Sequence, residues 1–287
     1  MRKIKGTDCG RIGWLLVSIF FLAAIVTARP MRPSLLQLTR SAPVVVVAQI
    51  ESVGEGLLTA KTRRVIKGSQ VPKRMSLNVN YPESEGGAAC PISLPDVGET
   101  VVIFAKPQAD RYEAVFDGSG IVSSAQFHNS SQNLKGYEDA IGRLVEYDSA
   151  TSSQDRAALL LSMLEDGYFN QESATQIIYL EITPQKYPTE GLVTPLLNLA
   201  RDARNTLQVP AIQALSRIGG KPVIPELIQL LDSENIYARE TVANVLKDKT
   251  RVDLGFDPSA PEDQRAEQVK KWLQWWNENK DRVQLHH

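Results

Sequence analysis

The chain has 287 residues, with 32 Lys and Arg against 33 Asp and Glu, three His and two Cys. This length favours two domains, and an apolar fraction of 43% is enough for ordinary packed cores, which excludes wholesale disorder. A net charge of −1 lacks the basic excess typical of nucleic-acid binders, and so few His and Cys leave little material for a metal or nucleophile site.

Residues 1–28 have the pattern of a secretory signal peptide. Basic residues precede an uncharged run of 17 residues, Ile12 to Ala28, which ends in the small-residue pattern Val26-Thr27-Ala28. We therefore predict export, to the periplasm or out of the cell. The alternative is an uncleaved anchor in the inner membrane through residues 12–28, because a run of this length lies at the short end of bilayer-spanning helices.

Cleavage after Ala28 removes four basic residues and one acidic residue, which leaves 28 basic and 32 acidic residues and a single cysteine, Cys90. One cysteine permits no intramolecular disulfide, so the exported chain must be stabilised by its own core. Residues 29–41, with Pro30 and Pro33, have the composition of a linker.

Residues 42–127 have the pattern of β-strands. The β-branched run Val44–Ile50 predicts a buried strand, and Met75–Tyr81 alternates with a period of two. Further strands are expected at 57–66, 100–105, 112–116 and 121–122. Several strands without an intervening helix predict a small closed barrel or a sandwich.

From Asn133 the apolar period is helical. Residues 133–150 predict a connecting helix, and residues 151–252 a series of helices in which Leu192–Ala200 matches Val223–Leu231 at an offset of 31 residues. The helices that follow match at the same offset. Each unit is a pair of short helices that cannot bury its apolar stripe alone, so we expect the units to stack.

Residues 253–287 predict a Trp-rich helix. Ser259 as N-cap and Glu262 three residues later form a capping-box pattern. The helix is expected to cover the last repeat with Trp272 and Trp276. The alternative is a platform for a sugar or a protein partner, to which Trp275 would belong.

The repeats carry a resemblance to a known family. Residues 223–232 and 238–246, with Arg239 at the start of the second helix, resemble HEAT repeats of the short, bilin-lyase-like bacterial type. Residues 255–276 are similar to the ends of exported bacterial HEAT-repeat proteins. The first unit departs from the pattern, since Pro210 stands near the position of the Arg.

The β region is similar to netrin-like, or metalloproteinase-inhibitor-like, domains of exported bacterial proteins, on the segments Val44–Ile50, Arg64–Gly68 and Gly98–Phe104 and on Cys90. The resemblance implies an OB-type barrel. Animal inhibitors of this type chelate the protease zinc through an N-terminal cysteine, whereas the expected mature N-terminus here is Arg29. The inhibitory group is therefore missing.

Together the patterns predict an α+β multidomain protein, with an OB-like β-barrel (42–127) followed by an α-solenoid of HEAT-like helical hairpins (151–252) and the capping helix (253–287). Cys90 and His128 are considered as a nucleophile and its base, but each lies in an expected loop without an orienting signal. The chain has no G-x-S-x-G, H-E-x-x-H, C-x-x-C or Walker motif. No catalytic, metal or cofactor residue is therefore predicted.

Candidate partner-binding residues come from two places. Basic residues concentrate around the second strand and its loop, where Lys61, Arg63 and Arg64 are the candidates, and Arg239 and Trp275 are candidates in the helical part. The basic strand is interpreted as a solvated face or as a surface for an acidic partner. Single-stranded nucleic acid is disfavoured, because residues 57–74 contain no aromatic side chain for base stacking.

The leading functional hypothesis is a non-enzymatic protein-binding or scaffold module with an unidentified protein partner, which uses its helical surface. The alternatives are a metalloprotease-inhibitor-like protein acting through the β domain, and a HEAT-like enzyme of the lyase type. No nucleic acid and no cofactor are expected, and contact with a membrane only if the N-terminal segment is uncleaved.

Overall fold

The computed structural model describes residues 33–54, 56–79, 94–116, 118–127, 133–183 and 189–286. The predicted signal peptide, Cys90 and His128 lie outside these ranges. Within them, no helix combines the length and the hydropathy that a membrane span requires.

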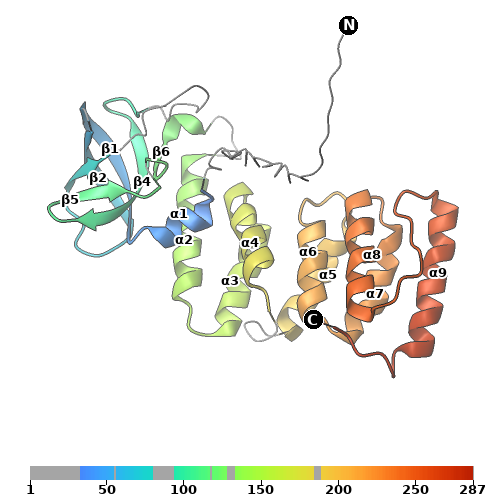
Figure 1. Cartoon of the computed structure of the whole chain (residues 1–287). Helices are drawn as coiled ribbons and strands as arrows, with labels where there is room; N and C mark the ends of the chain where they lie inside the picture. The colour runs from blue at the N-terminus through green and yellow to red at the C-terminus, as the bar shows by residue number, and fades with distance from the viewer. Residues whose placement is uncertain are drawn as a thin grey trace, which may run out of the picture. The chain divides into compact units, whose positions relative to one another are not determined.

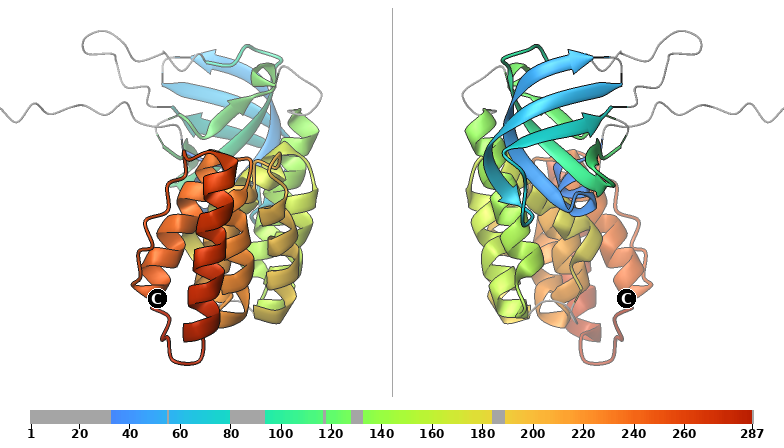
Figure 2. Two further views of the ribbon diagram at one scale, coloured as in Figure 1. Left: turned by 90° about the vertical axis from the view of Figure 1, so that its right-hand side faces the viewer. Right: turned by 90° about the vertical axis from the view of Figure 1, so that its left-hand side faces the viewer.

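Six strands form the β part of the chain (Figure 1): β1 (Val44–Gly54), β2 (Leu57–Lys67), β3 (Arg74–Asn78), β4 (Thr100–Gln108), β5 (Arg111–Ala114) and β6 (Ile121–Ser123). They pair in the order β1-β2-β3-β5-β4, and β4 pairs back with β1, so that five strands close into a barrel with β6 attached to β4. The β3–β5 pairing is parallel, and the other pairings are antiparallel. The curvature of the closed sheet is visible in Figure 2. The predicted α+β composition with an N-terminal barrel is therefore present.

Strand β1 is buried on both sides, which explains its continuous apolar run. Val46, Ala48 and Ile50 belong to the interior of the barrel. Val45, which points to the other side, belongs to the core that the barrel shares with the helices. Strand β4 repeats this division with Ile103 inside the barrel and Phe104 outside it. A strand covered on both faces loses the alternation that marks a half-buried strand.

Helix α1 (Leu35–Ser41) lies in the segment that was predicted to be a linker. Ser34 and Gln37 form a capping box at its N-terminus, and Leu35, Leu36 and Leu38 are buried. The linker prediction for 29–41 is therefore wrong over its last residues. The capping box satisfies the first main-chain N–H groups, and burial of the leucines stabilises a helix that would be too short to persist alone.

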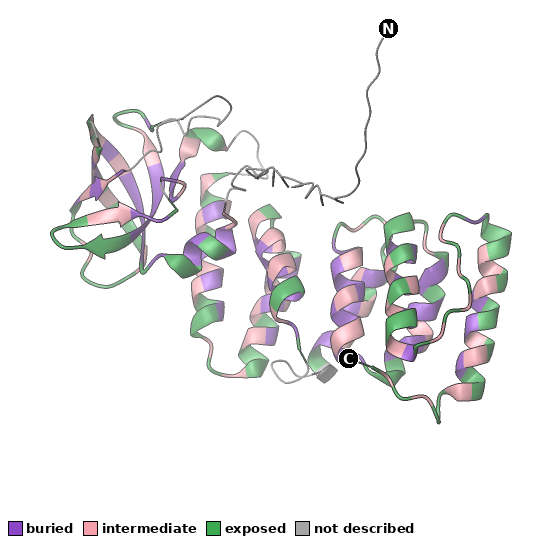
Figure 3. Ribbon diagram, viewed as in Figure 1, coloured by how far each residue is buried: buried purple, intermediate pink, exposed green. Residues whose placement is uncertain are grey.

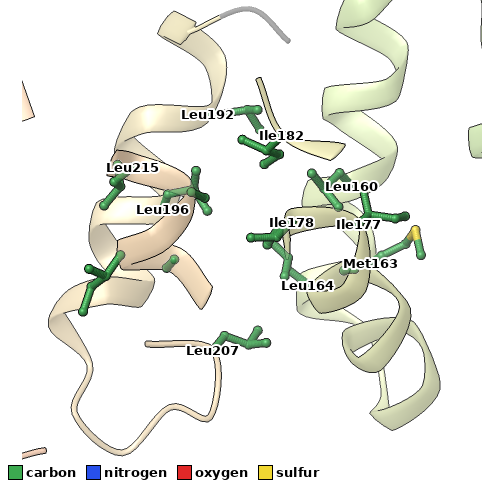
Figure 4. Packing of buried hydrophobic residues seen from close by; sticks show 14 of the residues in the cluster. Leu160, Met163, Leu164, Ile177, Ile178, Ile182, Leu192, Leu196, Leu207 and Leu215 are labelled. Atoms are coloured by element: carbon green, nitrogen blue, oxygen red, sulfur yellow. The ribbon is translucent and has the colours of Figure 1, made fainter. Parts of the chain in front are cut away.

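Further helices follow the barrel: η1 (Ser124–Gln126), α2 (Leu134–Ser149), α3 (Ser153–Glu165), α4 (Tyr168–Glu181), α5 (Thr189–Arg201), α6 (Gln208–Ile218), η2 (Lys221–Val223), α7 (Ile224–Gln229), η3 (Leu230–Asp232), α8 (Ile236–Thr250) and α9 (Glu262–Asn279). Most of them carry buried and exposed residues on opposite sides (Figure 3). The close-up in Figure 4 shows Ile178 of α4, and Ile182 just after it, on the side that faces Leu192 and Leu196 of α5; all four belong to the same core.

The barrel and the helices share one hydrophobic core. Phe104 of β4 makes an edge-to-face contact with Tyr137 of α2, with ring centroids 6.3 Å apart. Tyr137 in turn contacts Phe169 of α4 at 5.0 Å and Phe127 at 5.2 Å. Residues 32–287 accordingly form one compact unit, where the sequence suggested a separate barrel and helical array.

Helix α1 also joins the helices by charge. The Arg40 guanidinium binds Asp148 of α2, with 2.7 Å between Nη2 and Oδ1, and it also pairs with Glu181 at the end of α4. These partners raise the pKa of Arg40, first through the hydrogen bond with Asp148. An element that precedes the barrel in the chain is thus part of the helical layer that follows it.

The predicted α-solenoid of HEAT-like hairpins is wrong. A solenoid stacks similar units that contact only their neighbours, and at least three are needed for stability. The offset of 31 residues relates only two helix pairs, α5–α6 and α7–α8, and in the second pair the first helix is broken into η2, α7 and η3. One continuous core instead runs from the outside of the barrel and α1, through α2 and α4, to the last helices of the chain.

The start of the last helix also differs from the prediction. Helix α9 begins at Glu262 with Pro261 as N-cap, and no side chain caps it. The Ser259 main-chain N–H instead donates to Asp257 Oδ1 at 2.9 Å, in a turn before the helix. Pro261 has no N–H, so the helix start has one main-chain donor fewer to satisfy.

Candidate functional site

Cationic side chains gather on the outside of the barrel at β2 and β3. We call this surface the cationic face and define it by Lys61, Arg63, Lys73 and Arg74, all of which are exposed. Lys61 and Arg74 lie opposite each other in the β2–β3 register. Glu51 of β1 is the carboxylate among them, and Arg74 Nε lies 2.5 Å from its Oε2.

Two irregularities of the β1–β2 pairing shape this face. Val47 pairs with Arg64 and Ala48 with Thr62, which leaves Arg63 as an extra residue on β2. A second irregularity between Ile50 and Ser52 leaves Glu51 as an extra residue on β1. An extra residue bends the strand and redirects its side chains. The buried alternation of β2 accordingly ends at Ala60, and charged residues follow.

The electrostatics of the face are set by its excess of cations. The hydrogen bond from Arg74 lowers the pKa of Glu51, and the charges of Arg74, Lys61 and Arg63 lower it further. Arg63 also donates to the Gln49 side chain. Lys61 has no hydrogen bond or ion pair within the part of the chain that the structure describes. The three cations around Glu51 therefore leave a local charge of +2 that no described side chain neutralises.

Arg64, the third candidate on β2, belongs to a different environment. It forms an ion pair with Glu138 of α2, so its side chain ties the barrel to the helices. Both residues line a groove of about 450 Å³ between the end of β2 and α2. Asp139 binds Lys135 at 2.7 Å, and Arg143 lies 3.6 Å from Glu146. Asp166, the remaining charged residue of the described lining, accepts a hydrogen bond from Asn170 Nδ2 at 3.1 Å. The groove therefore offers few free charges to a ligand.

Arg239 is not a surface residue, and its interpretation as a partner-binding residue is wrong. Its side chain is 8% exposed. Nε donates to the main-chain oxygen of Pro258 at 2.7 Å, and Nη1 donates to those of Ser233 and Glu234 at 2.7 and 3.1 Å. Arg239 thus fixes the turn before α8 to the segment before α9.

Trp275 is half-buried rather than free on the surface. Its ring lies 5.8 Å from that of Trp272 and 6.4 Å from that of Trp276, measured between centroids. Trp272 and Trp276 are buried in the core, and Trp275 packs against its edge. The three rings cover the end of the helical layer, and we do not retain Trp275 in the candidate site.

A second concavity, which the sequence did not indicate, lies at the ends of α6 and α8. Arg217, Lys221 and Lys249 line a pocket of about 230 Å³ whose other walls are mostly apolar. Only two features of the sequence relate to this pocket. Arg217 and Lys249 lie near the C-termini of helices, and the Gly219–Gly220 pair follows Arg217. Basic residues at such positions ordinarily bind the last carbonyls of a helix, so the pattern alone does not indicate a pocket.

No metal site is found in the described ranges, where no three His, Cys, Asp or Glu residues come close enough to hold an ion. The chain matches no known family model, and searches of curated proteins and of solved structures gave no match. The family resemblances seen in the sequence therefore stay predictions.

Proposed function

We propose that the chain is an exported, non-enzymatic binding module whose cationic face recognises an acidic surface on a protein partner. The observation that carries the proposal is the group of Lys61, Arg63 and Arg74 around the single carboxylate of Glu51. Export rests on the pattern of residues 1–28, as in the sequence analysis.

The arrangement of the cations supports recognition rather than fold stability. Like charges directly opposite each other on neighbouring strands destabilise a sheet, and Lys61 stands opposite Arg74. The carboxylate of Glu51 offsets this only in part. A carboxylate of a partner, placed between Lys61 and Arg74, would relieve the repulsion on binding.

The barrel holds these side chains at fixed positions. Strand β2 pairs with β1 on one side and with β3 on the other, so the main chain beneath the face is tied at both edges. Complementary charge across an interface increases the association rate and selects the partner. The expected affinity therefore falls as salt rises, because exposed charges are screened.

The same geometry favours binding over catalysis. Glu51 is the acidic group of the face, and its lowered pKa makes it a weak general base near neutral pH. A nucleic-acid partner is disfavoured, because residues 57–74 supply no aromatic ring on which a base could stack. An acidic protein surface requires only the fixed cations that are present.

The test is capture of a partner by tagged residues 29–287 from the envelope and periplasmic fraction of the source cells, followed by mass spectrometry. The variant Lys61→Glu/Arg74→Glu reverses the charge of the face. The matched control is Lys135→Glu/Lys270→Glu, which changes the net charge equally on exposed helical sites.

We expect one dominant acidic protein with the native chain and with the control, and its loss with the face variant. Raising the salt from about 50 to about 200 mM should weaken the complex, since the Debye length falls over that range. Equal capture by the face variant, or no specific capture by the native chain, would contradict the proposal.

A further inference from the structure

The pocket at the ends of α6 and α8 joins cationic side chains to an apolar floor. Arg217, Lys221 and Lys249 supply the positive charge, and no carboxylate is part of its described lining. The apolar wall consists of Leu215, Val223, Ile224, Leu227 and Leu285. Such a combination fits a ligand with an anionic end and an apolar body.

A tight turn shapes one side of the pocket. A Cβ at Gly219 would lie 1.9 Å from Cγ2 of Val223, and Gly220 has a φ of 59°. Both positions therefore require glycine or a large rearrangement. The turn brings Lys221 and Val223 of η2 next to the end of α6.

The C-terminal segment forms the opposite side. The His286 main-chain N–H donates to the Lys249 main-chain oxygen at 3.0 Å, and this bond places the preceding Leu285 in the wall. The pocket is thus assembled from α6, η2, α7, the end of α8 and the segment after α9. These elements meet only in the folded chain.

Two of the three cations are held by helix ends. Arg217 Nη1 donates to the main-chain oxygens of Ile178 and Tyr179 at the end of α4, at 2.9 and 2.7 Å. Lys221 Nζ donates to the Lys280 main-chain oxygen at 2.8 Å. Each keeps further N–H groups that these bonds do not use, because a guanidinium carries five and an ammonium three.

Lys249 differs from the other two. It is half-buried, and its ammonium has no hydrogen bond or ion pair within the described ranges. Burial lowers the pKa of Lys249, and the neighbouring Asp248 of the same helix opposes that effect. A half-buried ammonium without a partner is costly unless a ligand supplies an acceptor.

We propose that this pocket binds a small organic carboxylate, with Lys249 as the principal anchor. Arg217 and Lys221 add positive charge at the rim, and the apolar body of the ligand lies against Leu215, Ile224 and Leu285. A volume of about 230 Å³ corresponds to about eight water volumes, so the ligand is small. Free phosphate fits less well, because it has no apolar part to occupy the floor.

The experiment is titration calorimetry on residues 29–287 at constant ionic strength. The probes are hexanoate, its neutral analogue hexanamide, and inorganic phosphate. We expect saturable hexanoate binding with a dissociation constant of about 1 mM, the range open to a ligand of this size. Hexanamide and phosphate should bind at least about tenfold more weakly. Hexanamide lacks the negative charge, and phosphate lacks the apolar chain.

Variants assign the anchor. Lys249→Gln should weaken hexanoate at least about tenfold, whereas Lys249→Arg should retain most of the affinity. The matched control is Lys247→Gln, which removes a lysine of the same helix that is exposed and bound to Asp253. Circular dichroism melts establish that each variant is folded.

Three results would overturn the proposal. They are the absence of hexanoate binding to the native chain, equal affinity for hexanoate and hexanamide, and a folded Lys249→Gln variant that binds as the native chain does. The cationic face on β2 and β3 takes no part in this site, so its capture experiment is an independent test.

Discussion

The barrel has two outer sides with opposite properties. At β1 and β4, Val45, Val102 and Phe104 are fully buried in the core that the barrel shares with the helices. At β2 and β3, Lys61 and Arg74 are exposed and share a single carboxylate. Along each strand, residues that point into the barrel alternate with residues that point outward. Where the outward residues are apolar, helices cover that side of the barrel; where they are charged, the side stays exposed and can contact a partner.

The covered side should dominate stability. Phe104→Ala removes the ring that contacts Tyr137 and should lower the free energy of unfolding by about 3–5 kcal/mol, the usual cost of deleting a buried Phe side chain. Urea unfolding followed by far-UV circular dichroism and by the fluorescence of the α9 tryptophans measures this change. Because the core is shared, both probes should shift together.

The exposed Phe116 supplies the control for this substitution, since Phe116→Ala should change stability by less than about 0.5 kcal/mol. If Phe104→Ala shifted the circular dichroism transition but left the tryptophan transition in place, the barrel and the helices would be separate cooperative units. The comparison of the two sides would then lose its structural basis.

Substitution of Arg239 tests whether a buried charged side chain serves stability rather than partner binding. Arg239→Met keeps much of the side-chain packing but leaves three main-chain oxygens without their donor. We expect a loss of about 1–3 kcal/mol in the free energy of unfolding, with partner capture unchanged. Arg143→Met, at a half-exposed site on α2 where the side chain is 43% accessible, should have little effect. Normal stability combined with lost capture would restore Arg239 as a binding residue.

The free energy of unfolding should depend on pH through Glu172 of α4. Burial raises the pKa of Glu172 above that of the unfolded chain, so its stabilising effect is complete below a pH of about 4.3 and is lost as the pH rises through the folded-state value. Glu172→Gln should therefore be more stable than the native chain at pH 7, by less than about 1 kcal/mol, because the group is only half-buried. The difference should vanish near pH 4. Urea unfolding at both pH values measures it, and an equal difference at each would contradict the assignment.

The smallest effect is expected on the exposed side. Lys61→Glu should change the free energy of unfolding by less than about 0.5 kcal/mol, because the side chain is exposed and the substitution removes the repulsion with Arg74. Chemical unfolding checks this value beside the capture experiment. A loss of several kcal/mol would show that Lys61 serves the fold, and the functional interpretation of the cationic face would fail.

The candidate site was predictable only in part. Lys61 and Arg63 follow from a cluster of basic residues in one strand, which is a local property of the chain. The different role of Arg64 depends on Glu138, which is distant in sequence. Arg239 was misassigned for the same reason, since its acceptor Pro258 lies beyond the helix that carries it. The pocket around Lys249 could not be predicted, because Leu285 reaches it from the end of the described chain.

Local patterns were sufficient for the type and order of most elements, because periodicity, β-branching and turn residues act over a few neighbours. The strand at 44–50 and the helix after Asn133 follow from them directly. Long-range contacts alone decided that α1 joins the helices, that the barrel and the helices have a common core and that no solenoid forms. The physical reason is that an apolar stripe shows that a surface will be buried, while the identity of the covering element depends on how the whole chain packs.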